Sequence, residues 1–122
     1  FKYINDKHGH DIGDLLLKEV SKRIQGCLRE SDTAARIGGD EFVVLLPSID
    51  SVYTAKLVAE KIRHTLCMPY SIAGNSLLIS CSIGIAIYPE HGDDEKTLLK
   101  NADTAMYLAK QNGRNTLVFF AA

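Results

Sequence analysis

A pair of glycines between two strand-like runs is the feature that most constrains the fold of this chain. Gly38 and Gly39 separate the short run 35–37 from the strongly apolar run 42–46. Glycine takes positive φ values without steric cost, which a tight two-residue turn between antiparallel strands requires. The pattern therefore predicts a β-hairpin with its turn at the glycine pair.

Two carboxylates, Asp40 and Glu41, directly follow this pair. Backbone N–H groups without neighbouring side chains suit close contact with phosphate, and an adjacent carboxylate can hold a divalent cation that bridges the same phosphates. Neighbouring side chains of a strand face opposite sides, so we rank Asp40 first as a ligand unless a bulge intervenes. Taken alone, the same residues also fit an ordinary hairpin with a solubilising acidic tip.

The composition is that of a soluble globular protein. The chain has 122 residues, of which 46% are hydrophobic and 24% charged, and its formal net charge of −1 does not favour nucleic acid as a partner. No apolar stretch reaches the length of a membrane span and no secretory leader is visible, so we expect a cytoplasmic domain whose parent protein is either soluble or membrane-anchored. The three separated cysteines indicate neither a disulfide framework nor a zinc site.

Helical and strand patterns alternate along the chain. Apolar residues at helical spacing predict helices over 14–28, 52–66 and 94–111, with Asp11 or Asp14 available to cap the first. Ahead of that helix, His8 and His10 are expected in a loop. After the first hairpin, strands are expected at 70–72, 77–87 and 116–120, with a turn at 74–75. The strand 77–87 would place bulky residues on one face and small residues, open to close approach, on the other.

In this order the motifs resemble one family, the GGDEF domain, which is the catalytic domain of diguanylate cyclases. The motifs that carry the resemblance cover nearly the whole chain: Phe1-Lys2-x-Ile4-Asn5-Asp6, Gly9-His10-x-x-Gly13-Asp14, Arg29-x-x-Asp32, Gly38-Gly39-Asp40-Glu41-Phe42, and the segments 82–86, 102–110 and 113–115.

The resemblance implies an α+β fold, with helices packed on a palm-like antiparallel sheet of the ferredoxin-like, nucleotide-cyclase type. It also implies a bacterial signalling enzyme in which two such domains form a homodimer. Each domain binds GTP with Mg²⁺ or Mn²⁺, and the 3′-hydroxyl of one GTP attacks the α-phosphorus of the other. The products are cyclic di-GMP and two pyrophosphates.

Site residues follow from the resemblance one position at a time. It implies guanine recognition by Asn5 and Asp14, phosphate contact by Gly38, Gly39, Lys110 and Arg114, and metal binding and catalysis by Asp40 with Glu41. Each has a plainer interpretation. Asn5 fits a turn, Asp14 fits a helix cap, and Lys110 and Arg114 suit the carbonyl end of a helix.

Arg29 and Asp32 precede the glycine pair, with five residues between Asp32 and Gly38. The family's inhibitory product site has the same placement. A guanidinium can engage guanine and phosphate in bidentate fashion, and Asp32 can accept from guanine N–H groups. The resemblance therefore implies binding of cyclic di-GMP here. A solvated helix end is the alternative for an isolated tetrapeptide of this kind.

The family normally places a strand, a helix and a second strand with a metal-binding Asp ahead of the motif that begins at Phe1. We therefore expect residues 1–122 to form a GGDEF domain lacking its first strand and helix, and to be inactive by themselves. The parent chain would add a sensory or regulatory domain. Two competing hypotheses are a non-catalytic receptor module for GTP or cyclic di-GMP and a plain interaction domain of ferredoxin-like fold.

Overall fold

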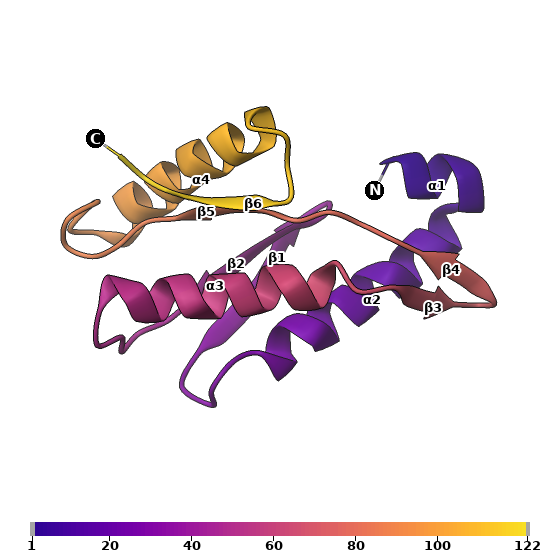
Figure 1. Cartoon of the computed structure of the whole chain (residues 1–122), viewed down its shortest axis with the longest axis horizontal. Helices are drawn as coiled ribbons and strands as arrows, with labels where there is room; N and C mark the ends of the chain where they lie inside the picture. The colour runs from indigo at the N-terminus through magenta and orange to yellow at the C-terminus, as the bar shows by residue number, and fades with distance from the viewer. Residues whose placement is uncertain (1, 122) are drawn as a thin grey trace. The chain divides into compact units, whose positions relative to one another are not determined.

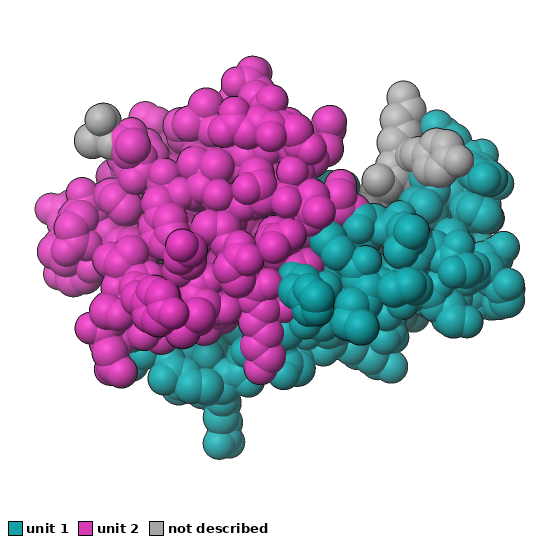
Figure 2. Space-filling model, in the orientation of Figure 1, with its two compact units in different colours: residues 1–49, 64–79 teal, residues 50–63, 80–122 magenta. Residues whose placement is uncertain are grey.

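The computed structural model describes residues 2–121 (Figure 1). These residues form two compact units (Figure 2). The first combines Phe1–Ile49 with His64–Ile79, and the second combines Asp50–Arg63 with Ser80–Ala122. Whether residues 1–122 act as one domain stays a prediction.

The first unit begins with two helices, α1 (Lys2–His8) and α2 (His10–Gly26). Gly9 separates them with φ 91°, a value that L side chains rarely adopt. The predicted loop around His8 and His10 is therefore wrong. Both histidines are helical, and the bend is confined to a single glycine.

The start of α2 also differs from the expected one. Its N-cap is Gly9, with no side-chain cap, so neither Asp11 nor Asp14 caps the helix. The apolar face is confirmed, because Leu16 and Val20 are buried.

A hairpin of β1 (Thr33–Gly38) and β2 (Glu41–Leu45) follows α2, as the sequence predicts. A second hairpin in this unit joins β3 (Tyr70–Ile72) to β4 (Asn75–Leu77). Its turn residues are Ala73 and Gly74, with φ 48° and 81°, one position earlier than expected. Positive φ at both positions is the requirement of a type I′ turn.

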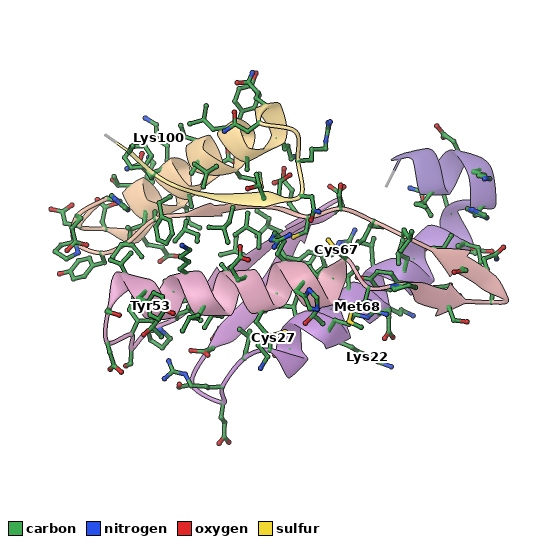
Figure 3. The ribbon with its side chains drawn as sticks, in the orientation of Figure 1. Lys22, Cys27, Tyr53, Cys67, Met68 and Lys100 are labelled. Atoms are coloured by element: carbon green, nitrogen blue, oxygen red, sulfur yellow. The ribbon has the colours of Figure 1, made fainter. Side chains whose placement is uncertain are left out.

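Arg23 ties α2 to the second segment of the first unit. Its guanidinium donates to the carbonyls of Thr65, Met68 and Pro69 at 2.8–3.1 Å and stacks 3.6 Å from the ring centroid of Tyr70. Nearby, the Cys27 Sγ donates to Thr65 Oγ1 at 3.6 Å. Cys27 and Met68, which take part in these bonds, are labelled in Figure 3. These bonds connect residues more than 35 positions apart in the chain.

The second unit contains most of α3 (Val52–Leu66) and the elements β5 (Ser82–Ile85), α4 (Glu95–Gln111) and β6 (Thr116–Phe119). Both helices match their predicted ranges. Asp94 caps α4 by accepting from the N–H of Thr97 at 2.7 Å, which holds the pKa of Asp94 below its usual value. In Figure 1, α4 covers one side of the β5–β6 pair.

Gly84 of β5 is the point where α4 approaches the strand most closely. A Cβ at this position would collide with the backbone of α4 at Ala102 and Met106. The prediction of a small-residue face open to close approach is confirmed here.

The strands form three separate two-stranded sheets in the described residues. The predicted long strand 77–87 is wrong, because β4 ends at Leu77 and β5 begins at Ser82. Two of the pairs are antiparallel, as expected, whereas β5 and β6 are parallel. The crossover through α4 returns the chain in the same direction, which produces a parallel pair. The α+β class itself is confirmed.

In the part of the chain that the structure covers, no helix combines the length and the apolar character that crossing a membrane requires.

Candidate functional site

The tip of the β1–β2 hairpin is formed by Gly39 and Asp40. Gly38 pairs with Glu41 across the strands, so the predicted turn at Gly38 and Gly39 is displaced by one residue. Gly39 has φ 50°, and glycine at the first turn position is what a type II′ turn requires. Asp40 is therefore a loop residue with an exposed carboxylate, and Glu41 is the half-buried first residue of β2.

A β-bulge interrupts β1, the first strand of this hairpin. Arg36 pairs with Phe42, and the register then shifts so that Ile37 has no partner of its own. From the bulged strand, Arg36 Nε donates to the carbonyl of Gly39 at 2.7 Å. The loop that carries Asp40 is thus held by the Arg36 side chain as well as by the backbone pairing of β1 with β2.

The donor set around Asp40 suits a cation that also has phosphate ligands. Among residues 2–121, no group of three or more His, Cys, Asp or Glu side chains is placed to hold a metal ion. Mg²⁺ is commonly bound by one or two carboxylates together with substrate phosphates rather than by a cage of protein ligands. Asp40 with Glu41 fits that arrangement and does not fit a structural metal site.

An open pocket of about 440 Å³ lies between α2 and this hairpin, within the first unit. It is lined by Asp14, Leu17, Lys18, Ser21, Arg36 and Phe42. Of these, the sequence pointed to Asp14 alone as a binding residue. Lys18, Ser21 and Arg36 carry no motif of their own. The one signal available was that Lys18 and Ser21 follow Asp14 at helical spacing, four and seven residues later.

Asn5 lies beside the start of this helix. Its Oδ1 atom is buried and has no hydrogen-bond partner in the described structure. It occupies the space where a Cβ on Gly13 would lie, so the absent side chain of Gly13 makes room for the Asn5 amide. The structure thus brings Asn5 against Gly13, the residue that precedes Asp14 on α2.

Arg29 and Asp32 are bonded to each other in a turn between α2 and β1. The backbone N–H of Arg29 donates to Asp32 Oδ2 at 2.9 Å, and its guanidinium donates to both carboxylate oxygens at 3.3 and 3.4 Å. The Asp32 side chain is only 2% exposed, whereas that of Arg29 is 57% exposed. Arg29 also donates to the carbonyl of Ser48 at 2.7 Å. Arg29 is therefore oriented by Asp32 and remains accessible to a ligand.

We expect Asp32 to make the stability of the chain sensitive to acid. The backbone N–H and then the side chain of Arg29 hold the pKa of Asp32 below its ordinary value of 3.8. A depressed folded pKa stabilises the fold above pH 3.8, and this contribution is lost as the pH falls through the folded pKa. Urea unfolding at pH 3 to 7 should show a smaller acid-induced loss in Asp32→Asn than in the wild type. An identical pH dependence in the two proteins would contradict this assignment.

Lys110 and Arg114 lie at the C-terminal end of α4, in the second unit. Both are exposed. Arg114 has φ 62°, and its N–H donates to the carbonyl of Ala109 at 3.1 Å. This is the capping geometry of a helix end, so the plainer interpretation of these cations is compatible with the structure.

The fold and the hairpin together define a class: an α+β domain with a glycine-acid hairpin tip next to an open pocket. The family model described as "Diguanylate cyclase, GGDEF domain" matches residues 1–116. The chain belongs to this family.

Three similar proteins illustrate the match. The bifunctional diguanylate cyclase/cyclic di-GMP phosphodiesterase MucR of Pseudomonas aeruginosa is 49% identical over 120 residues, which are 98% of this chain and 17% of MucR. The crystal structure of the GGDEF domain of PA1120 (YfiN or TpbB) from the same species has a TM-score of 0.95 and 42% identity, covering 99% of this chain and 76% of that one. The GGDEF domain of DgcB from Caulobacter crescentus, solved in complex with c-di-GMP, has a TM-score of 0.88 and 26% identity, covering 99% and 72%.

These likenesses confirm the family and the fold class expected from the motifs. The chain spans about a sixth of the length of MucR.

Proposed function

We propose that this chain is the GTP-binding part of a diguanylate cyclase domain, which condenses two GTP molecules into cyclic di-GMP and two pyrophosphates. The observation that carries the proposal is the exposed Asp40 loop, bordered by the pocket that Asp14 and the hairpin line together. Phosphoryl transfer depends mainly on positioning and charge stabilisation, and a glycine-acid loop beside a nucleotide-sized pocket supplies both.

Guanine recognition is assigned to Asn5 and Asp14. An amide and a carboxylate together offer the donor and the acceptors that the edge of guanine requires. A buried amide oxygen without a partner costs about 1–3 kcal/mol, so the Asn5 Oδ1 atom calls for an explanation, and pairing with a donor of the ligand is the one we propose. The plainer interpretation of Asp14 as a helix cap is wrong, which strengthens its assignment to a ligand.

Gly13→Ala tests this assignment. A Cβ at position 13 would displace the Asn5 amide, so GTP affinity should fall about fivefold, the effect of losing a hydrogen bond worth about 1 kcal/mol. The fold should persist, because Ala is favoured over Gly in a helix by about 1 kcal/mol. Gly26→Ala on the same helix is the matched control, since a Cβ there meets nothing within 4 Å. Equal GTP affinity of both variants by calorimetry would remove Asn5 from the site.

Asp40, with Glu41 as a second carboxylate, would hold Mg²⁺ or Mn²⁺ against the phosphates of GTP. When bound, the cation would neutralise phosphate charge and polarise the attacked phosphorus. Gly38 and Gly39 would let the phosphates approach the backbone closely. Lys110 and Arg114 would contribute positive charge toward the terminal phosphates.

Each domain would hold one of the two reacting nucleotides, so the proposed active form is a homodimer of GGDEF domains. The 3′-hydroxyl bound in one half would attack the α-phosphorus bound in the other. A sensory or regulatory domain in the same polypeptide would control this pairing. Since its substrate GTP is a cytoplasmic nucleotide, we place the domain in the cytoplasm.

The proposal is tested by GTP binding and product formation in Mg²⁺ and in Mn²⁺. We expect the 122-residue chain to bind GTP but to turn it over poorly, because among residues 2–121 no three His, Cys, Asp or Glu side chains are grouped to hold a metal ion. A form of the protein with additional upstream sequence should produce cyclic di-GMP, detected by chromatography. Absence of GTP binding by both forms would overturn the proposal.

A non-catalytic receptor module is the second candidate function. The observation that supports it is the Arg29–Asp32 pair, in which a 57% exposed guanidinium is oriented by a buried carboxylate and could take cyclic di-GMP without any chemistry at Asp40. A receptor would bind GTP or cyclic di-GMP and yield no product in the longer form, so the same assay separates the two candidates.

We propose that Arg29 binds cyclic di-GMP and mediates product inhibition, with Asp32 holding the guanidinium in place. Arg29→Ala should weaken cyclic di-GMP binding by about 1–3 kcal/mol, the scale for a charged hydrogen-bond partner. Calorimetry with the chain measures this, with Lys22→Ala as a control that removes an exposed cation of α2. Unchanged affinity in Arg29→Ala would rule out the site.

A further inference from the structure

We infer that Arg36 is a positioning residue that fixes the Asp40 carboxylate for its divalent cation. The inference rests on the proposed function, since it concerns the same loop. It is drawn from the hydrogen bond between Arg36 Nε and the carbonyl of Gly39, at 2.7 Å.

The carbonyl of Gly39 and the N–H of Asp40 belong to one peptide group. Because a peptide group is planar, a bond to that carbonyl also fixes the plane that ends at the Cα of Asp40. Gly39 has φ 50° and no side chain, so the bond from Arg36 adds a side-chain restraint on this plane to the restraint from the paired residues Gly38 and Glu41. Arg36 therefore constrains the direction in which the exposed Asp40 side chain leaves the loop.

The bulge explains why Arg36 can reach this carbonyl. The register shifts between Arg36 and Gly38, and a bulge redirects the side chains around it. The Nε–H group is one of five donors of the guanidinium. Arg36 also lines the pocket with Asp14 and Lys18, so its charge lies beside the proposed phosphate site.

The test measures Mn²⁺ affinity rather than turnover. Free Mn²⁺ is followed by electron paramagnetic resonance while the chain is titrated in the presence of an α,β-methylene analogue of GTP. Arg36→Met keeps the aliphatic stem and removes the donor and the charge. We expect it to weaken Mn²⁺ binding by about 10- to 100-fold, the usual effect of losing a group that orients a metal ligand. Arg36→Lys retains the charge and a donor and should lie between wild type and Arg36→Met.

Two variants that each remove a lysine separate the positioning effect of Arg36 from a general effect of positive charge. Lys18→Met removes a cation from the same pocket without touching the Gly39 carbonyl, and its effect should be smaller. Lys22→Met removes an exposed cation further along α2, labelled in Figure 3, and should leave Mn²⁺ affinity unchanged. An effect of Lys18→Met as large as that of Arg36→Met would overturn the inference in favour of bulk electrostatics.

Equal Mn²⁺ affinity in wild type and Arg36→Met would overturn the inference and leave the proposed function intact. If the wild-type chain binds no Mn²⁺ with the analogue, the proposed function fails and the inference fails with it. Circular dichroism and thermal unfolding of each variant confirm that any difference in affinity arises in a folded chain.

Discussion

Asp40→Asn should reduce cyclic di-GMP formation by at least about a hundredfold, the scale for removing one preorganised electrostatic group from an active site. The substitution replaces a charged oxygen ligand with a neutral amide of the same shape. Asp40 is exposed in a two-residue loop, so the change removes no core contact and the fold should remain stable. The measurement is chromatography of products, made under the conditions in which the proposed cyclase activity is detected.

Asp93→Asn is the matched control for this prediction, because Asp93 is also exposed and belongs to the second unit, whereas the hairpin belongs to the first. It should retain full activity. Metal titration adds a second criterion, since loss of a ligand should raise the Mg²⁺ concentration needed for any residual turnover. Normal product formation by Asp40→Asn would show that Asp40 is not the metal ligand.

Gly84→Ala should be the most destabilising single-methyl substitution in the second unit. The added Cβ would overlap the backbone of α4 at Ala102 and Met106, and a helix backbone cannot move aside as a flexible side chain can. Overpacking of this kind costs about 1–3 kcal/mol and occasionally more. Urea unfolding of wild type and variant measures the difference in unfolding free energy.

Gly26→Ala again serves as a control, because a Cβ there meets open space. It should not lower the unfolding free energy, and should raise it by at most about 1 kcal/mol because Gly26 is the last residue of α2 and Ala is favoured over Gly in a helix. A similarly small change in Gly84→Ala would mean that α4 does not pack on β5 as closely as the structure shows.

The helices α3 and α4 could be predicted because their local signals agree. Each has apolar residues at helical spacing, and α4 has an N-cap Asp94. The helix α1 could not be predicted in this way, because Gly9 interrupts the pattern and its φ of 91° depends on how α1 and α2 meet. Alternation along 77–87 predicted one long strand, yet alternation says nothing about whether each residue finds a pairing partner.

Of the candidate site, the sequence predicted only the residues that belong to a family motif. The family motifs pointed to Asn5, Asp14 and Asp40, whose roles stay predictions, and the structure places Asn5 against Gly13 and Asp14 in the pocket beside the hairpin. The sequence did not point to Arg36 and Lys18, because their proposed roles depend on α2 packing against the β-hairpin. That contact is long-range and leaves no pattern in the neighbouring sequence.

Arg23 has a consequence for how the first unit can be dissected. This unit is discontinuous in sequence, and residues 50–63 of the other unit lie between its two segments. The three carbonyl bonds of Arg23 and its stacking on Tyr70 join these segments without using the peptide chain between them. Chain connectivity and structural connectivity therefore diverge here: neither segment is a natural fragment by itself, and a boundary drawn by residue number alone would divide the first unit.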